Sequence, residues 1–188
     1  MVAFPTETFY GLGGDPKQSK TISRLFEIKK RDGHKPISLI LSSEKILKKW
    51  VVGIKKREKI LIKKYWPGPL TLICRAKKKV SSRLTAGSGK IGVRVSNEPI
   101  ARKLAEALGG AITATSANFS GEPSISSSRK IRGRLKKEID GIVSTSKTKK
   151  LKPSSGSTIV DVTEKELKLI REGDISFEEI QHFLRKKI

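Results

Sequence analysis

The 188-residue chain contains few of the residues on which several common kinds of site depend. It has one cysteine, Cys74, so an internal disulfide and a cysteine-rich zinc site are excluded. His34 and His182 are the only histidines, which leaves too few parts for a zinc cluster or a Ser-His-Asp triad. Because Cys74 ends the apolar segment 70–74, we expect a buried thiol that packs as a small hydrophobic group.

Long apolar runs and nucleotide-binding glycine loops are also missing. No apolar stretch approaches the length of a membrane span, and residues 1–5 lack the regions of a secretory signal. We therefore expect a cytoplasmic protein with no membrane partner. No Walker-type loop occurs, and Gly11–Gly14 lacks the spacing of a dinucleotide fingerprint. If a nucleotide binds, it binds by another geometry.

Acidic and aromatic residues are scarce, whereas basic residues are abundant. The chain has 41 Lys and Arg against 18 Asp and Glu, a formal charge of +23, and its aromatic content is 5%. Such a charge attracts polyanions without choosing among them. The excess gathers in residues 45–64 and 120–155. A solvated lysine-rich surface is one interpretation of these stretches and direct RNA binding is another, although no basic-aromatic stacking platform is visible.

Hydrophobic periodicity and capping residues predict alternating strands and helices. Strands are expected at 2–4, 37–41, 70–76, 90–95, 111–114, 142–143, 157–162 and 167–171. Helices are expected from about 19 to 32, at 43–50, 55–65, 97–108 and 127–137, and after the capping box of Ser176–Glu179. Loops are expected at 6–14 and, as a basic and flexible segment, at 144–156. This order predicts one α/β domain over residues 1–188, with a twisted mixed sheet flanked by helices.

Four polar segments fall beside predicted strand ends, where α/β sheets commonly bind ligands. Arg94 alternates with Val93 and Val95, so it faces away from the core. Taken alone, the segment Thr115–Gly121 is equally well explained as a turn that ends a strand. Hydroxyls, an amide and fixed cations together predict a pocket for phosphate and carboxylate groups. The segments are Thr6–Tyr10, Lys29–Lys35, Thr115–Gly121 and Ser157–Thr158, and Arg94 and Arg171 complete the pocket.

Six motifs that occur in order carry a family resemblance. They are Phe4–Gly13, Lys29–Arg31, Trp66–Leu72, Gly92–Val95, Ser116–Gly121 and Ser157–Asp161. From Val2 to about Ile175 the chain resembles the YrdC family of threonylcarbamoyl-AMP synthases. The resemblance implies a twisted sheet with a cationic concave face, on which ATP, L-threonine and bicarbonate condense to threonylcarbamoyl-AMP and pyrophosphate. It also implies Mg²⁺ bound with ATP, and a tRNA-modifying transferase complex that accepts the product.

The resemblance assigns roles to residues by position. Lys29 and Arg31 match the family's Lys-x-Arg motif, and they are expected to stabilise charge at the transferring phosphoryl group. The expected ATP-binding residues are Lys29, Arg31, Lys35, Ser116, Asn118 and Arg171. The expected threonine-binding residues are Thr8, Arg94 and Ser157, and no protein-held metal site is expected.

The chain departs from the family pattern in three places. Only residues 1–4 precede Pro5, so the family's N-terminal helix is expected to be missing, and no additional C-terminal domain is expected. The basic segment 147–152 stands where relatives tend to have a glycine-rich turn. Two other functions stay open: a noncatalytic RNA-binding module of the same fold, and a relative that makes a different carbamoyl adenylate, as in hydrogenase maturation.

Overall fold

The central feature of the computed structural model is one twisted mixed sheet. The structure describes residues 1–30, 33, 35–119, 121–144 and 153–187. Within these residues, the sheet has the strand order β7-β1-β2-β6-β3-β5-β4-β8-β9. The pairs β1/β7, β3/β5 and β4/β8 are parallel, and the other neighbours are antiparallel. The strands are β1 (Val2–Phe4), β2 (Gly11–Gly13), β3 (Ser38–Leu41), β4 (Leu70–Arg75), β5 (Lys90–Val95), β6 (Ala111–Ser116), β7 (Gly141–Ile142), β8 (Thr158–Asp161) and β9 (Lys168–Arg171).

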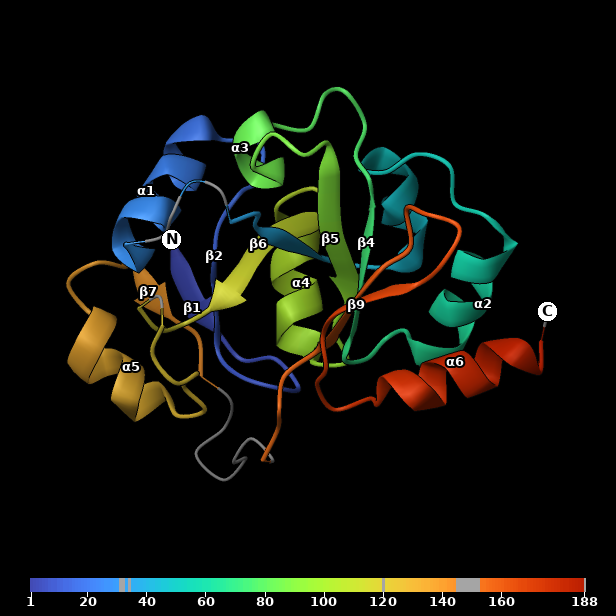
Figure 1. The fold of residues 1–188 in the computed structure, drawn as a ribbon. Coiled ribbons are helices and arrows are strands. Elements are labelled where there is room, and N and C mark those ends of the chain that lie inside the picture. The colour runs from blue at the N-terminus through green and yellow to red at the C-terminus, as the bar shows by residue number, and fades with distance from the viewer. Residues whose placement is uncertain (31–32, 34, 120, 145–152, 188) are drawn as a thin grey trace.

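Helices flank this sheet, as Figure 1 shows. They are α1 (Ser19–Lys29), the 3₁₀ helix η1 (Glu44–Lys49), α2 (Lys56–Tyr65), α3 (Ser82–Thr85), α4 (Pro99–Ala107), α5 (Ser128–Leu135) and α6 (Phe177–Arg185). Helices α2 and α6 lie side by side at one end of the molecule, where the Tyr65 and Phe183 rings meet edge to face at 5.8 Å. Helix α5 lies at the other end, next to β7.

Each strand alternates its side chains between two faces of the sheet, and the two faces are covered differently. One face packs in a large core that includes Leu39, Val93 and Leu72 from the strands and Leu25 and Leu61 from helices. The other face has a small core under α4, formed by Phe4, Ile40, Ile112, Ala101 and Ala105. Helix α4 covers only part of this second face, and the part beyond it remains open.

The termini of the helices show why they begin and end where they do. Helix α4 starts with Pro99 after Glu98, whose side chain accepts a hydrogen bond from the Ile100 N–H at 3.3 Å. At the start of α6, the Ser176 hydroxyl accepts from the Glu179 N–H at 3.1 Å, which confirms the predicted cap. Helix α1 ends at Lys30, which adopts a left-handed backbone conformation with φ of 46°.

The structure confirms the predicted mixed sheet flanked by helices, and it differs from the predicted elements in three places. Residues 11–13 form β2 instead of part of a loop, because they pair with both β1 and β6. Residues 82–85 form the short helix α3, which the sequence reasoning missed. In α4 the sequence spacing predicts that Ile100, Leu104 and Leu108 face the core, but the buried residues are Ala101 and Ala105, because small side chains let the helix approach the sheet closely. The predicted flexible loop falls mostly on residues 145–152, outside the described residues.

Burial makes a prediction for Cys74. Its side chain is 3% exposed, and burial, helped by the carboxylates of Glu58 and Asp161, raises the pKa of the thiol to about 12. We therefore expect the folded protein at pH 8 to react with a thiol-specific disulfide reagent at least roughly 100-fold more slowly than the protein in concentrated urea. Absorbance at the wavelength of the released chromophore measures both rates. Equal rates would contradict the buried position.

Candidate functional site on the open sheet face

The open part of the second sheet face forms a cavity of about 450 Å³. Its floor consists of alternate residues of neighbouring strands, among them Ser38 of β3, Gly92 and Arg94 of β5, and Thr71 of β4. Gly92 keeps this floor low, because a Cβ atom there would lie 2.5 Å from the Ser38 Oγ. The walls come from Thr6, from loop residues 8–10 and 35–37, from Gly156 and Ser157, and from Arg171.

The three predicted threonine-binding residues all line this cavity. Thr8, Arg94 and Ser157 are buried residues that come from the loop before β2, from β5, and from the residue before β8. The Thr8 hydroxyl lies 3.0 Å from that of Thr6, and the Ser157 hydroxyl accepts from the Thr71 hydroxyl at 3.0 Å. The fold therefore brings together three side chains that lie up to 149 positions apart in the sequence.

Arg171 places a second guanidinium next to that of Arg94. Its Nη2 donates to the Ser157 carbonyl at 2.7 Å and to the Ser157 hydroxyl at 3.1 Å, and its Nε donates to the same carbonyl at 3.2 Å. Burial and the nearby charge of Arg94 lower the pKa of Arg171. Two like charges held close together in a partly dehydrated cavity attract an anion that relieves their repulsion.

Lys29 and Asn118 lie behind the cavity wall and are not among the residues that line it. The Lys29 side chain is buried, and its ammonium donates to the Ser116 carbonyl at 2.6 Å, to the Asn118 carbonyl at 2.6 Å and to Asn118 Oδ1 at 2.8 Å. The Ser116 hydroxyl donates to the same Oδ1 at 2.5 Å, and the Asn118 amide nitrogen donates to the Glu122 carbonyl. These bonds fix the backbone that carries Ser116, which does line the cavity.

The structure thus divides the predicted site residues into three groups. Lys35, Ser116 and Arg171 line the cavity together with the three predicted threonine-binding residues. Lys29 and Asn118 support that wall from behind. Arg31 lies outside the described residues, as do His34, Ser120 and the basic segment 147–152. Lys29 and Asn118 thus reach the cavity that Arg94 lines only through their contacts with Ser116.

Sequence reasoning missed two carboxylates at this site. Glu7 pairs with Arg94 and also accepts from the Ser96 hydroxyl. Asp161 lines the far end of the cavity and pairs with Lys90 at 3.0 Å. Glu7 lies inside the motif Phe4–Gly13. The sequence signal for its role was that it is the only charged residue of this loop, between two threonines, in a strongly basic chain. For Asp161 the signal was its place at the end of the last buried strand.

Asp161 is held in its ionised form by its hydrogen bonds. Its Oδ1 accepts from the Thr163 N–H at 2.8 Å and from the Thr163 hydroxyl at 2.6 Å, and its Oδ2 accepts from the Lys90 ammonium. Burial acts to raise the pKa of Asp161, but the bonds from Thr163 and Lys90 outweigh it and hold the pKa below its usual value. Both oxygens are therefore engaged with the protein.

Among the described residues, no group of three or more His, Cys, Asp or Glu side chains is arranged to hold a metal ion. In the same part of the chain, no helix is both long enough and apolar enough to cross a bilayer.

Fold and cavity together define an α/β protein with a polar ligand site on one sheet face. The chain belongs to the Sua5/YciO/YrdC family, whose model, described as "Telomere recombination", matches residues 1–173. It is 35% identical to the threonylcarbamoyl-AMP synthase of Pyrococcus abyssi over 96% of this chain and 52% of the relative. It is 39% identical to the enzyme of the same name from Alkalilimnicola ehrlichii over 72% of this chain and 70% of the relative.

A solved structure has the same fold. Sua5 of P. abyssi in complex with L-threonine matches with a TM-score of 0.88 and 34% identity, over 97% of this chain and 53% of that protein. The chain thus spans about half the length of this relative.

The buried Lys29 ammonium should contribute to stability. Lys29→Met removes the buried ammonium that donates to the Ser116 carbonyl, the Asn118 carbonyl and Asn118 Oδ1, so we expect the free energy of unfolding to fall by about 2–4 kcal/mol. Lys20→Met is the matched control, because Lys20 lies exposed on the same helix, and it should change stability by less than about 0.5 kcal/mol. Urea unfolding followed by circular dichroism measures both. Equal stability of the two variants would contradict a stabilising role of the Lys29 hydrogen bonds.

The lowered pKa of Asp161 predicts a pH dependence. Asp161→Asn weakens the bonds to Lys90 and Thr163, so at pH 7 we expect it to lower the unfolding free energy by about 1–3 kcal/mol. A carboxyl with a depressed pKa contributes stability above its unfolded-state pKa, near 3.8, and loses it as the pH falls through the folded-state pKa. The difference between wild type and variant should therefore be constant above about pH 5 and shrink below pH 4. Urea titrations from pH 3 to pH 7 measure it, and a difference at pH 3 as large as that at pH 7 would contradict it.

Proposed function

We propose that this chain forms L-threonylcarbamoyladenylate from ATP, L-threonine and bicarbonate, which makes it a nucleotidyltransferase. The threonine amine combines with carbon dioxide derived from bicarbonate, loses a proton and becomes a carbamate. A carbamate oxygen then attacks the α-phosphorus of ATP, and the bond from that phosphorus to the bridging oxygen breaks. Pyrophosphate leaves with the bonding electrons. No covalent enzyme intermediate is required, so the protein's tasks are to position reactants and stabilise negative charge.

The observation that supports the proposal is the pair of guanidiniums at one end of a cavity lined with hydroxyls. Arg94 and Arg171 lie close enough for one charge to lower the pKa of the other, and Thr8 and Ser157 line the same cavity. A guanidinium binds a carboxylate through parallel N–H groups, and short hydroxyls hydrogen-bond an amino acid's polar groups at little entropic cost. This end of the cavity fits the amino-acid substrate.

We assign the nucleotide phosphates to Lys35 and Ser116, and we assign Arg171, which lies next to Arg94, to the place where the two substrates react. Lys29 and Asn118 then act through Ser116, because their polar groups hold its backbone and hydroxyl in place. Arg31, outside the described residues, stays a predicted phosphate ligand. In this proposal Mg²⁺ arrives with ATP as part of the substrate, held by phosphate oxygens and water, since both oxygens of Asp161 are engaged with protein groups.

The relatives support the same reaction. Proteins named threonylcarbamoyl-AMP synthase match nearly the whole of this chain, and one solved relative holds L-threonine. Because the chain spans about half of these two relatives, the proposal rests on the cavity that this chain itself builds. The product would pass, in the cytoplasm, to a tRNA-modifying transferase that attaches the threonylcarbamoyl group to adenosine.

The competing functions make different predictions in one assay. The proposed reaction releases pyrophosphate from ATP only when bicarbonate and threonine are both present, and mass spectrometry detects the acyl adenylate. A relative that makes another carbamoyl adenylate releases pyrophosphate without threonine. A noncatalytic RNA-binding module shows no such release and binds RNA with a steep dependence on salt. Absence of the acyl adenylate under saturating substrates would overturn the proposal.

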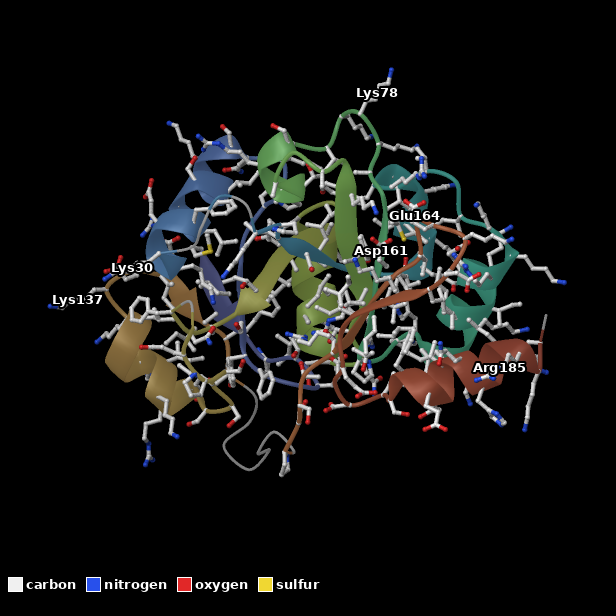
Figure 2. The ribbon with its side chains drawn as sticks, in the orientation of Figure 1. Lys30, Lys78, Lys137, Asp161, Glu164 and Arg185 are labelled. Carbon is white, nitrogen blue, oxygen red and sulfur yellow. The ribbon has the colours of Figure 1, made fainter. Side chains whose placement is uncertain are left out.

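Arg94 provides the sharpest single-residue prediction. Arg94→Ala removes the charge-assisted bonds to the threonine carboxylate, so we expect the KM for threonine to rise roughly 10- to 100-fold. Arg185→Ala is the matched control, because Arg185 is exposed on α6 and Figure 2 shows it at the end of the molecule, far from the sheet face. Pyrophosphate release at varied threonine measures both variants. An unchanged threonine KM in Arg94→Ala would contradict this role.

A further inference from the structure

Glu7 connects two walls of the cavity that are far apart in the sequence. It precedes Thr8 in the loop between β1 and β2, and its carboxylate reaches across to β5. Oε1 accepts from Arg94 Nη1, and Oε2 accepts from the Ser96 hydroxyl. The side chains of the ion pair are 9% exposed for Arg94 and 16% for Glu7, so water screens the pair little.

The loop that carries Glu7 is fixed by its own hydrogen bonds. The Thr6 hydroxyl accepts from the N–H groups of Thr8 and Phe9, both at 3.2 Å, and donates to the Phe9 carbonyl at 2.6 Å. At the other end, the Ser96 hydroxyl also accepts from the Glu98 N–H at 3.2 Å, just before α4. The loop that carries Glu7 and the Ser96 hydroxyl that binds its carboxylate are therefore both held by local hydrogen bonds.

Arg94 depends on this carboxylate for its orientation. Among the described residues, the bond from Nη1 to Glu7 is its one hydrogen bond to protein, while the side chain lines the cavity. Its other N–H groups thus remain available to a ligand. The nearby Arg171 charge repels the Arg94 guanidinium, and the Glu7 carboxylate offsets that repulsion. Because Glu7 holds Nη1, it also sets the direction in which the other N–H groups of Arg94 point.

We propose that Glu7 is a positioning residue, which holds the Arg94 guanidinium in the orientation that receives the carboxylate of threonine. This inference rests on the proposed function, because it takes threonine as the ligand of Arg94. Glu7 fills this role without contacting a substrate. Its effect should appear in the binding of threonine and leave the KM for ATP unchanged, since the phosphates are assigned to Lys35 and Ser116, which Glu7 does not contact.

Glu7→Gln tests the proposal, because glutamine keeps the size of the side chain and removes the charge. We expect the KM for threonine to rise about 10-fold, with kcat and the KM for ATP changed less than about twofold. Ser96→Ala keeps the ion pair but frees one carboxylate oxygen, and it should raise the threonine KM about threefold. In an Arg94→Ala background, Glu7→Gln should add less than about a twofold change, because Glu7 acts through Arg94.

Glu106→Gln on the exposed side of α4 is the matched control and should retain wild-type constants. Thermal unfolding of every variant separates loss of the fold from loss of the Arg94 orientation. If Glu7→Gln does not fold, Ser96→Ala tests whether the Glu7 carboxylate positions Arg94. If Arg94→Ala loses threonine while both Glu7→Gln and Ser96→Ala keep the wild-type KM, the inference is wrong and the proposed function stands. If the wild-type protein shows no threonine-dependent reaction, both are wrong. Equal rises in the KM for ATP and for threonine would also overturn the positioning role.

Discussion

The incomplete covering of one sheet face is the constraint on which the site depends. Strands β3, β5 and β4 send alternate side chains to both faces, and one face is fully packed in the large core. On the other face, α4 covers Ile40 and Ile112 and stops there. Next to that edge the floor changes from apolar residues to Ser38, Thr71 and Arg94, with Gly92 leaving room between them. The apolar half anchors the sheet, and the polar half is free to bind a ligand.

The polar residues around this cavity are held in place by hydrogen bonds to other protein groups. Lys29 holds the backbone at Ser116 and Asn118, and Arg171 is held by Ser157. The Lys29 ammonium is a buried polar group that would destabilise the fold without these bonds, so stability and site geometry depend on the same contacts. This coupling explains why residues that the family resemblance assigns to ligand binding, such as Lys29 and Asn118, are engaged with protein groups in this structure.

Charge is distributed unevenly between the cavity and the outer surface. Figure 2 shows Lys30, Lys78 and Lys137 at the rim of the molecule, where water surrounds them, whereas Asp161 lies over the central strands. At the cavity, two carboxylates are paired with cations: Glu7 with Arg94 and Asp161 with Lys90. The surface excess attracts polyanions in general, but selectivity for a small ligand requires the paired and oriented charges inside.

The amino-acid sequence by itself determined the strands other than β2, most of the helices, the buried Cys74 and the polar segments that line the cavity, because periodicity, caps and short-range turn chemistry are local properties. It also carried the motifs of the family. Only the tertiary structure decided that Gly11–Gly13 pairs as a strand, that Lys29 lies behind the cavity wall and that Glu7 reaches Arg94. These features depend on contacts between residues 87 or more positions apart, and such contacts are set by how the strands are ordered in the sheet.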